Sequence, residues 1–190
     1  HASTIGNHEF DNGIDNIAAQ LSHAQFDLLN ANYDLSNTSL NGLTKAHQIF
    51  EVNGISIGVF GLGIELEGLV SKDLYKETVY LNPIDVAKDQ TRLLRETHGC
   101  DLVICLSHLG YHYRNEKVDD IKLAEQTHGI DLIIGGHTHT FLDQPTVHKN
   151  AKNENVIINQ VGWAGINVGR IDFFLEDSNR WRTQGKSSQV

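Results

Sequence analysis

Three short motifs contain the side chains in this sequence that are best suited to hold metal ions. They are Gly6-Asn7-His8-Glu9-Phe10-Asp11, Ser107-His108-Leu109-Gly110 and Gly135-Gly136-His137-Thr138-His139. Together they supply one amide oxygen and four imidazoles, and these donors suit divalent transition metals. The glycines of the last motif permit a close backbone approach, so its two histidines can turn toward one site or toward two adjacent metals. Each motif is a weak signal alone, but the combination predicts a metal site.

The elements around these motifs predict that the histidines follow strands of a parallel sheet. The segment 97–104, THGCDLVI, is echoed by the segment 127–134, THGIDLII. In each, a helix is expected to end at His-Gly, an apolar strand follows, and a histidine comes after the strand. Runs that are apolar on both faces and preceded by helices favour a parallel sheet covered on both sides. Because ligands gather at the carboxyl ends of such strands, we expect His108, His137 and His139 to lie there.

The rest of the sequence predicts one α/β domain spanning residues 1–190. An amphipathic helix begins after residue 13, and Asn53-Gly54 predicts a tight hairpin between residues 47–52 and 55–62. Further expected elements are strands at 2–5 and 26–31, a helix at about 85–97, and antiparallel strands at 146–149, 156–161 and 165–175. Residues 176–190 are polar, and we expect a frayed tail there.

The composition excludes several classes of partner. The formal net charge is −9, so the surface repels polyanions and we expect no nucleic-acid partner. A small phosphate ester can still bind where cations are held locally. No apolar run reaches about 18 residues, so we expect no membrane span. The two cysteines, Cys100 and Cys105, are expected to be buried small hydrophobes rather than a disulfide or a zinc-thiolate site.

The order GNHE, then a lone histidine, then GHxH resembles the binuclear metallophosphoesterases, the calcineurin-like family. The form GNHEFDNG looks most like their 5'-nucleotidase branch. The resemblance implies a four-layer α/β/β/α sandwich and metal-dependent hydrolysis of phosphoric esters, with nucleoside 5'-monophosphates as the leading substrates. It also implies a periplasmic or secreted location. Alternatives are a 2',3'-cyclic phosphodiesterase, a sugar-nucleotide hydrolase, or a non-catalytic scaffold of the same fold.

The resemblance also implies roles for individual residues. Asn7, His108 and His137 would bind one divalent metal and His139 the other, with zinc, manganese, iron or cobalt all acceptable. A hydroxide bridging the two metals would attack phosphorus. His8 would assist the leaving group, and Asp11 would orient its imidazole. Glu9 and Phe10 are expected to cap or pack the turn.

Aromatic residues near the motifs leave two interpretations open. The segment Tyr111-His112-Tyr113-Arg114 follows the His108 motif and either lines a pocket or packs as a loop. Trp163 either stacks on a base or packs between strands. His98 and His128 are expected at helix ends, where the helix dipole favours them.

The sequence departs from the family pattern at its beginning. Complete members start with an Asp-x-His strand and a Gly-Asp segment whose carboxylate bridges the metals, and neither precedes Gly6. Because two unbridged dications repel strongly, we expect this chain alone to bind one metal at best and to be weakly active or inactive. The chain begins at His1 and has no methionine, so we interpret it as a piece or processed form of a longer protein.

The same departure has consequences for the expected sheet and its partners. The sandwich would lack its first strand region, and the exposed neighbouring strands favour self-association. A missing N-terminal segment, or a separate C-terminal nucleotidase domain, would be the partner that completes the protein.

Overall fold

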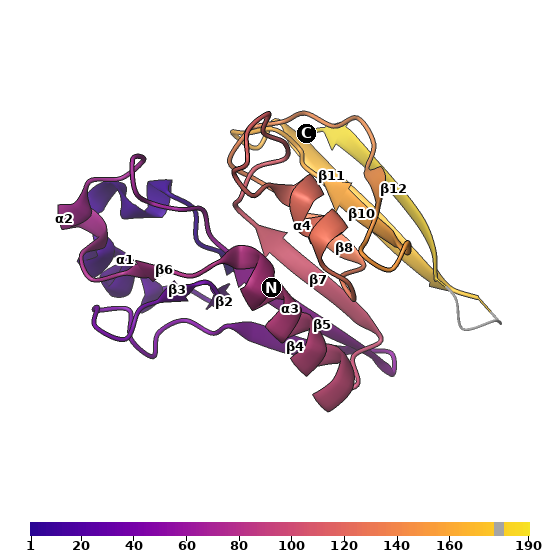
Figure 1. The fold of residues 1–190 in the computed structure, drawn as a ribbon, viewed down its shortest axis with the longest axis horizontal. Coiled ribbons are helices and arrows are strands. Elements are labelled where there is room, and N and C mark those ends of the chain that lie inside the picture. Colours follow the sequence, from indigo (N-terminus) through magenta and orange to yellow (C-terminus); the bar gives the residue numbers. More distant parts are fainter. Residues whose placement is uncertain (177–180) are drawn as a thin grey trace.

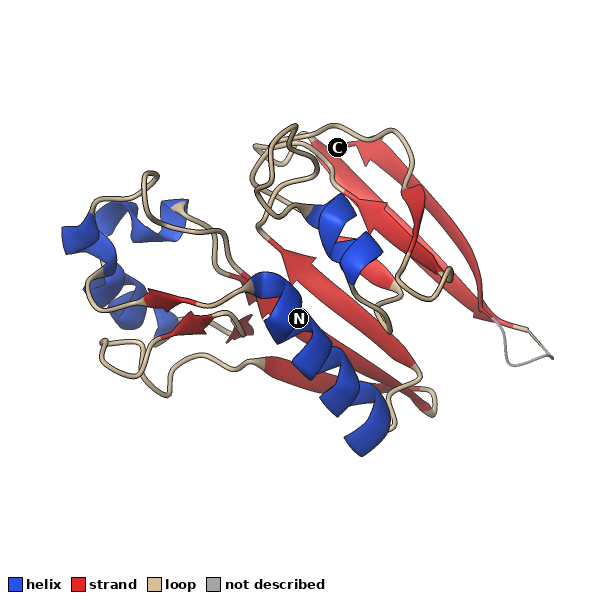
Figure 2. Cartoon of the chain, in the orientation of Figure 1, coloured by secondary structure: helices blue, strands red, loops and turns tan. Residues whose placement is uncertain are grey.

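A mixed six-stranded sheet forms the centre of the molecule (Figures 1 and 2). The computed structural model describes residues 1–176 and 181–190. The strand order is β4-β5-β7-β8-β10-β9. The strands are β4 (His47–Val52), β5 (Ile55–Leu62), β7 (Leu102–Ser107), β8 (Leu132–Ile134), β9 (Thr146–Lys149) and β10 (Asn155–Asn159). The inner strands β5, β7, β8 and β10 run parallel, and β4 and β9 pair antiparallel at the edges. The predicted parallel strands and the 53–54 hairpin are confirmed.

The two echoed segments begin strands β7 and β8 in the same way. Asp101 donates its backbone N–H to Ser56 O and accepts the Ser56 N–H on its carboxylate, both at 2.8 Å. Asp131 binds Val103 likewise, at 2.9 Å and 2.7 Å. Each aspartate therefore fixes the register of its strand against the preceding one. Arg95 joins the two turns, because its guanidinium donates to the carbonyls of both segments and pairs with Asp131.

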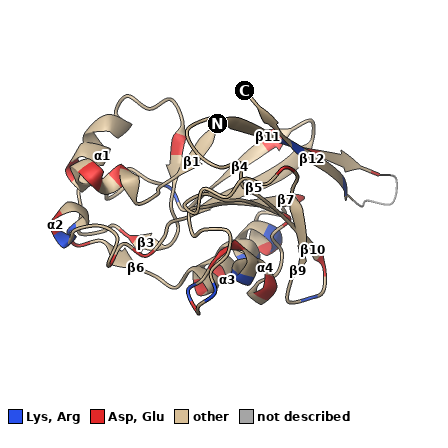
Figure 3. Cartoon of the chain, turned by 90° about the horizontal axis from the view of Figure 1, so that it is seen from above, with Lys and Arg blue, Asp and Glu red and all other residues tan. Residues whose placement is uncertain are grey.

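Two helices cover one face of this sheet, and the sheet–helix contact forms the larger core cluster. They are α3 (Pro83–Arg92), continued by the π-helical turn η2 (Leu93–Thr97), and α4 (Asp120–Gln126). The side chain of Asn82 caps α3 by accepting the N–H groups of Ile84 and Asp85. Figure 3 shows α3 and α4 on one side of the sheet and the antiparallel pair of β11 (Asn167–Leu175) and β12 (Trp181–Gln189) on the other. The helices account for the apolar residues on the face of β7 and β8 that they cover.

A second core cluster holds the N-terminal part of the chain. Its elements are β1 (Ala2–Thr4), η1 (His8–Asn12), α1 (Ile14–Leu21), β2 (Asp27–Leu29), β3 (Tyr33–Asp34), α2 (Lys72–Tyr75) and β6 (Val79–Tyr80). Strands β1 and β2 pair in parallel, and β3 pairs with β6. The ring of Phe10 is fully buried and meets Tyr33 edge-on, with centroids 6.1 Å apart. This cluster fixes the turn that follows β1, and with it the GNHE motif.

The C-terminal segment corrects the sequence prediction. Residues 181–189 form strand β12 (Trp181–Gln189), which pairs antiparallel along the whole of β11 (Asn167–Leu175). The expected frayed tail at 176–190 is therefore wrong for these residues, while residues 177–180 lie outside the described part. Likewise β11 takes β12, not the preceding strands, as its ladder partner. Most side chains of β12 are exposed, so the backbone ladder and the Trp181–Phe173 ring contact stabilise a strand of polar composition.

The remaining observations agree with the expected class of fold. The layered α/β architecture is confirmed, and both cysteines are free and buried. Within the described residues, no helix has the length and apolar character needed to cross a membrane. Acidic side chains outnumber basic ones, 24 to 15, and lie on several elements of the surface (Figure 3).

Candidate metal centre

The GNHE turn places Asn7 just beyond the carboxyl end of β1. Glu9 accepts the backbone N–H of Gly6 at 2.7 Å and closes the turn, as the sequence predicted. Gly6 has to be a glycine because the His108 ring packs against its backbone. A methyl group on Gly6 would lie 2.5 Å from His108 Cε1. The absence of a side chain therefore lets the end of β1 approach the end of β7.

The amide oxygen of Asn7 is the point where three of the predicted residues meet. It lies 3.2 Å from His108 Nε2 and 2.9 Å from His137 Nδ1. The two imidazole rings meet edge-on, with centroids 5.3 Å apart. Asn7 is itself buried, with 8% of its surface exposed. One oxygen and two ring nitrogens thus converge on a small volume, a donor set that fits one divalent cation.

The electrostatics keep both imidazoles in the form that binds metals. Burial lowers the pKa of His108 to about 4, and repulsion by His8 and His139 adds to the effect. Burial likewise lowers the pKa of His137 to about 4, with His108 as the next cause. Both rings are therefore neutral at pH 7. A neutral imidazole offers a nitrogen lone pair to a cation, whereas a protonated ring does not.

His8 and Asp11 form an exposed pair beside this cluster. His8 Nδ1 lies 3.0 Å from Asp11 Oδ2, and the side chains are 72% and 61% exposed. The short helix η1 separates them by three positions, which brings both side chains to one side of the turn. The outer nitrogen of His8 is left facing solvent, so it can reach a bound molecule.

His139 makes a ring contact of its own beside Asn7, His108 and His137. Its ring stacks on Trp163 at 5.8 Å between centroids, with 15° between the planes. Trp163 is 56% exposed, so the prediction that it packs between strands is wrong, while its stacking on a base stays a prediction. In the described part of the chain, no three His, Cys, Asp or Glu side chains gather closely enough to hold a metal. A second complete set of ligands is thus not formed by these residues.

Both histidines of the GHTH segment have unusual backbone conformations. His137 has φ of 68° and His139 has φ of 53°. This left-handed region costs a residue with a side chain about 1–2 kcal/mol. Such local strain persists only where surrounding contacts hold it.

Three buried polar residues, Ser107, Asp120 and Gln160, pack behind the site. The sequence did not predict this supporting role for any of them. The Asp120 carboxylate accepts the Ser107 hydroxyl at 2.5 Å, and its other oxygen faces Gly135 without a partner. Burial raises the pKa of Asp120 to about 7. Gln160, which is 1% exposed, binds the GGHTH segment. The available signal was that two apolar strands end in polar residues, one in Ser107 and the other in Asn159-Gln160.

In the loop after His108, Tyr111 and Tyr113 are partly buried and hydrogen-bonded, whereas His112 and Arg114 are exposed. Tyr113 donates its hydroxyl to Leu109 O at 2.9 Å, and its backbone N–H to Asp119 at 2.7 Å. Tyr111 donates its backbone N–H to the Thr138 hydroxyl at 2.9 Å. These bonds join the loops that carry His108 and His137.

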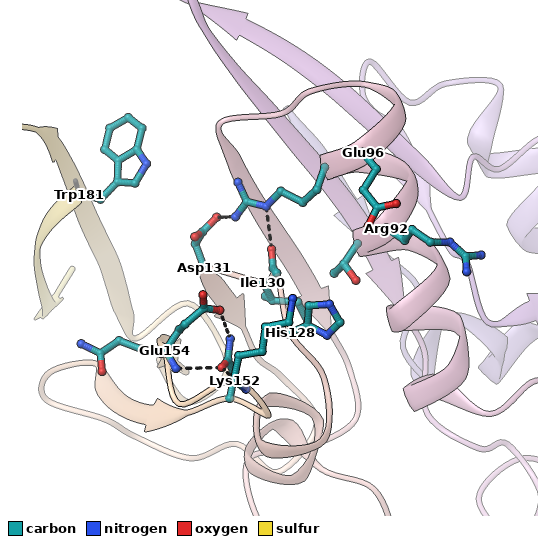
Figure 4. Close-up of a pocket in the computed structure, with 13 residues that line it drawn as sticks. Arg92, Glu96, His128, Ile130, Asp131, Lys152, Glu154 and Trp181 are labelled. Atoms are coloured by element: carbon teal, nitrogen blue, oxygen red, sulfur yellow. Dashed lines mark hydrogen bonds and ion pairs between the residues drawn. The ribbon is translucent and has the colours of Figure 1, made fainter. Parts of the chain in front are cut away.

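A cavity of about 700 Å³ lies at the other ends of the strands, away from this cluster (Figure 4). Its lining combines charges of both signs with an aromatic ring, and includes Arg92, Glu96, His128, Lys152, Glu154 and Trp181. Helix α4 ends at Gln126 with Thr127 as its C-cap, so the prediction of a helix end at His128 is wrong by two residues. The cavity is bordered by the turns that Arg95 joins. None of the candidate metal ligands is among the residues that line it.

Comparison with known proteins decides the family. The family model described as calcineurin-like phosphoesterase matches residues 1–141. The chain belongs to this family. The phosphoesterase match includes all three motifs from which the sequence prediction began, and it confirms the resemblance.

The relatives of this phosphoesterase domain act on nucleotides, according to their names. The trifunctional nucleotide phosphoesterase protein YfkN of Bacillus subtilis is 29% identical over 221 residues, covering all of this chain and 14% of that protein. A 5'-nucleotidase of Vibrio vulnificus is 30% identical over 193 residues, covering 90% of this chain and 34% of that protein. The crystal structure of a 5'-nucleotidase precursor from Thermus thermophilus superposes with a TM-score of 0.89 at 29% identity, covering all of this chain and 39% of that one. The chain therefore spans well under half the length of these relatives.

Proposed function

We propose that this chain is the metal-binding part of a phosphoric ester hydrolase of the 5'-nucleotidase type. The observation that carries the proposal is the position of Asn7 Oδ1 between His108 Nε2 and His137 Nδ1. The family membership and the names of the relatives support a nucleotide as the substrate. The periplasmic or secreted location that the resemblance implies stays a prediction.

The residues present fit one cation and part of a second site. Asn7, His108 and His137 would hold the first ion, and His139 would contribute to the second. When bound, divalent cations supply Lewis acidity that activates water and neutralises charge on the phosphoryl group. Because the described residues form no group of three or more His, Cys, Asp or Glu side chains that could hold a metal, we expect the chain alone to bind one ion at best and to turn over phosphate esters weakly or not at all.

His8 is the residue that we propose to assist the leaving group. Its imidazole is exposed and can approach the ester oxygen of a bound phosphate. The carboxylate of Asp11 would accept a hydrogen bond from Nδ1–H of His8, which orients the ring. The other nitrogen, Nε2, would then donate a proton to the alkoxide that leaves phosphorus.

Elemental analysis after incubation with manganese or zinc tests the proposed centre. We expect one ion per chain, lost in Asn7→Ala and His137→Ala and kept in the matched control His23→Ala, a histidine of the N-terminal loop. Hydrolysis of p-nitrophenyl phosphate and of AMP is measured on the same samples. Two ions with turnover would overturn the one-ion centre, and no ion in any sample would overturn the ligand assignment altogether.

A further inference from the structure

The strained histidines of the GHTH segment alternate with residues in ordinary conformations. His137 and His139 have positive φ, whereas Gly136, Thr138 and Thr140 do not. A segment of this kind relaxes unless other groups hold it. Gly136, Thr138 and Thr140 are the positions at which the segment is held.

One side chain binds all three of these positions. Gln160 donates its amide Nε2–H to Gly136 O at 2.7 Å. Its Oε1 accepts the backbone N–H of Thr140 and, at 3.1 Å, the hydroxyl of Thr138. Both ends of the amide are used, and the residue is 1% exposed. The side chain therefore spans the segment from one end to the other.

The same contact extends to the loop that carries His108. The Thr138 hydroxyl accepts the Tyr111 N–H at 2.9 Å while it contacts Gln160. Gln160 thus fixes the segment of His137 and His139 directly and relates it to the loop after His108 through one hydroxyl group. The geometry of the candidate metal centre depends on the positions of the three histidine rings. The Gln160 amide therefore lies where it can fix that geometry.

We propose that Gln160 is a positioning residue for the candidate metal centre, which holds His137 and His139 in left-handed conformations by bonds to the backbone and hydroxyl groups between them. The proposal rests on the proposed function for its consequence in metal binding. The brace itself, defined as the contacts of the Gln160 amide with Gly136, Thr138 and Thr140, is a property of the metal-free chain. Its two aspects are therefore measured separately.

Replacing Gln160 with methionine keeps the length of the side chain and removes every bond of the brace. In Gln160→Met, we expect the amide proton of Thr140 to exchange with solvent at the rate of an open loop, measured by NMR on the metal-free chain. We also expect Co²⁺, followed by its visible absorption, to bind about tenfold more weakly. Gln160→Glu keeps the acceptor oxygen and loses the donor, so it should give a smaller loss and serves if the methionine variant does not fold.

Asn159→Ala is the matched control. Asn159 precedes Gln160 and is also buried, at 4% exposure, but its side-chain amide faces Gly169 of β11. We expect this variant to lower thermal stability while it leaves Thr140 exchange and Co²⁺ affinity unchanged. Equal losses of affinity in both variants, or unchanged affinity in Gln160→Met, would overturn the positioning role. If the unsubstituted chain binds no Co²⁺, the metal centre and this role in it are refuted, and Thr140 exchange alone decides whether the brace exists.

Discussion

Replacing the buried Asp120 carboxyl group with an amide is expected to stabilise the domain above neutral pH. Burial raises the pKa of Asp120 from 3.8 to about 7. Between these values the folded state holds a proton that the unfolded state has lost, so the free energy of unfolding falls as pH rises. Each pH unit in this window changes it by about 1.4 kcal/mol. From pH 5.5 to pH 8 the loss amounts to about 2 kcal/mol, since the slope ends near pH 7.

Urea denaturation of the unsubstituted chain and of Asp120→Asn at several pH values measures this effect. The amide still accepts the Ser107 hydroxyl but does not ionise, so the stability difference between the two proteins should grow by about 2 kcal/mol across that range. Other groups that titrate in the same window contribute equally to both proteins and cancel in the difference. A difference that stays constant from pH 5.5 to pH 8 would show that Asp120 ionises normally, and the account of its burial would be wrong.

Further predictions concern Arg95, which joins the turns before β7 and β8, and the histidines of the site. Arg95→Met should lower the free energy of unfolding by about 3 kcal/mol in urea denaturation, because it leaves a largely buried carboxylate unpaired. Arg92→Met removes an exposed pair and should change little, and equal effects of the two would contradict the bridging role. Because the pKa values of His108 and His137 are about 4 in the folded chain, the unfolded chain binds more protons below pH 6.5, and metal-free stability should fall as pH drops from 6.5 to 4. The difference in urea stability between Asp120→Asn and the same variant with His108→Asn and His137→Asn isolates this trend, because the other titrating groups cancel in it. A difference that does not change with pH would refute neutral imidazoles.

The parts of the fold that sequence predicted correctly are specified by short-range signals. Asn53-Gly54 suits the backbone of a tight turn, and the two THG segments combine a helix end with an apolar strand. Strand β12 was missed because it is stabilised by its ladder with β11 and not by burial of its own side chains. A polar sequence with no alternation is indistinguishable from a loop until its partner is known.

The candidate site also contains residues that the sequence predicted and residues that it did not. His108 and His137 converge because they follow the neighbouring strands β7 and β8, whereas Asn7 follows β1 of a separate two-stranded sheet. The roles of all three residues as ligands stay predictions. Of the buried polar residues that support them, Asp120 carries no mark in the sequence and Gln160 is marked only by its place after an apolar run, since both residue types are mostly exposed in proteins. The stacking of His139 on Trp163 also depends on a loop contact that spacing does not reveal.

The position of Asn7 has a consequence for cooperativity. Asn7 follows β1 in the N-terminal core cluster, whereas His108 and His137 follow strands of the larger cluster. The hydrogen bond from His137 to the Asn7 amide oxygen joins residues 130 positions apart. A cation held by both would act as a cross-link between the two clusters, and like other long-range links it would disfavour the open chain. Loading of the centre would thus couple the melting of the two clusters into a single transition.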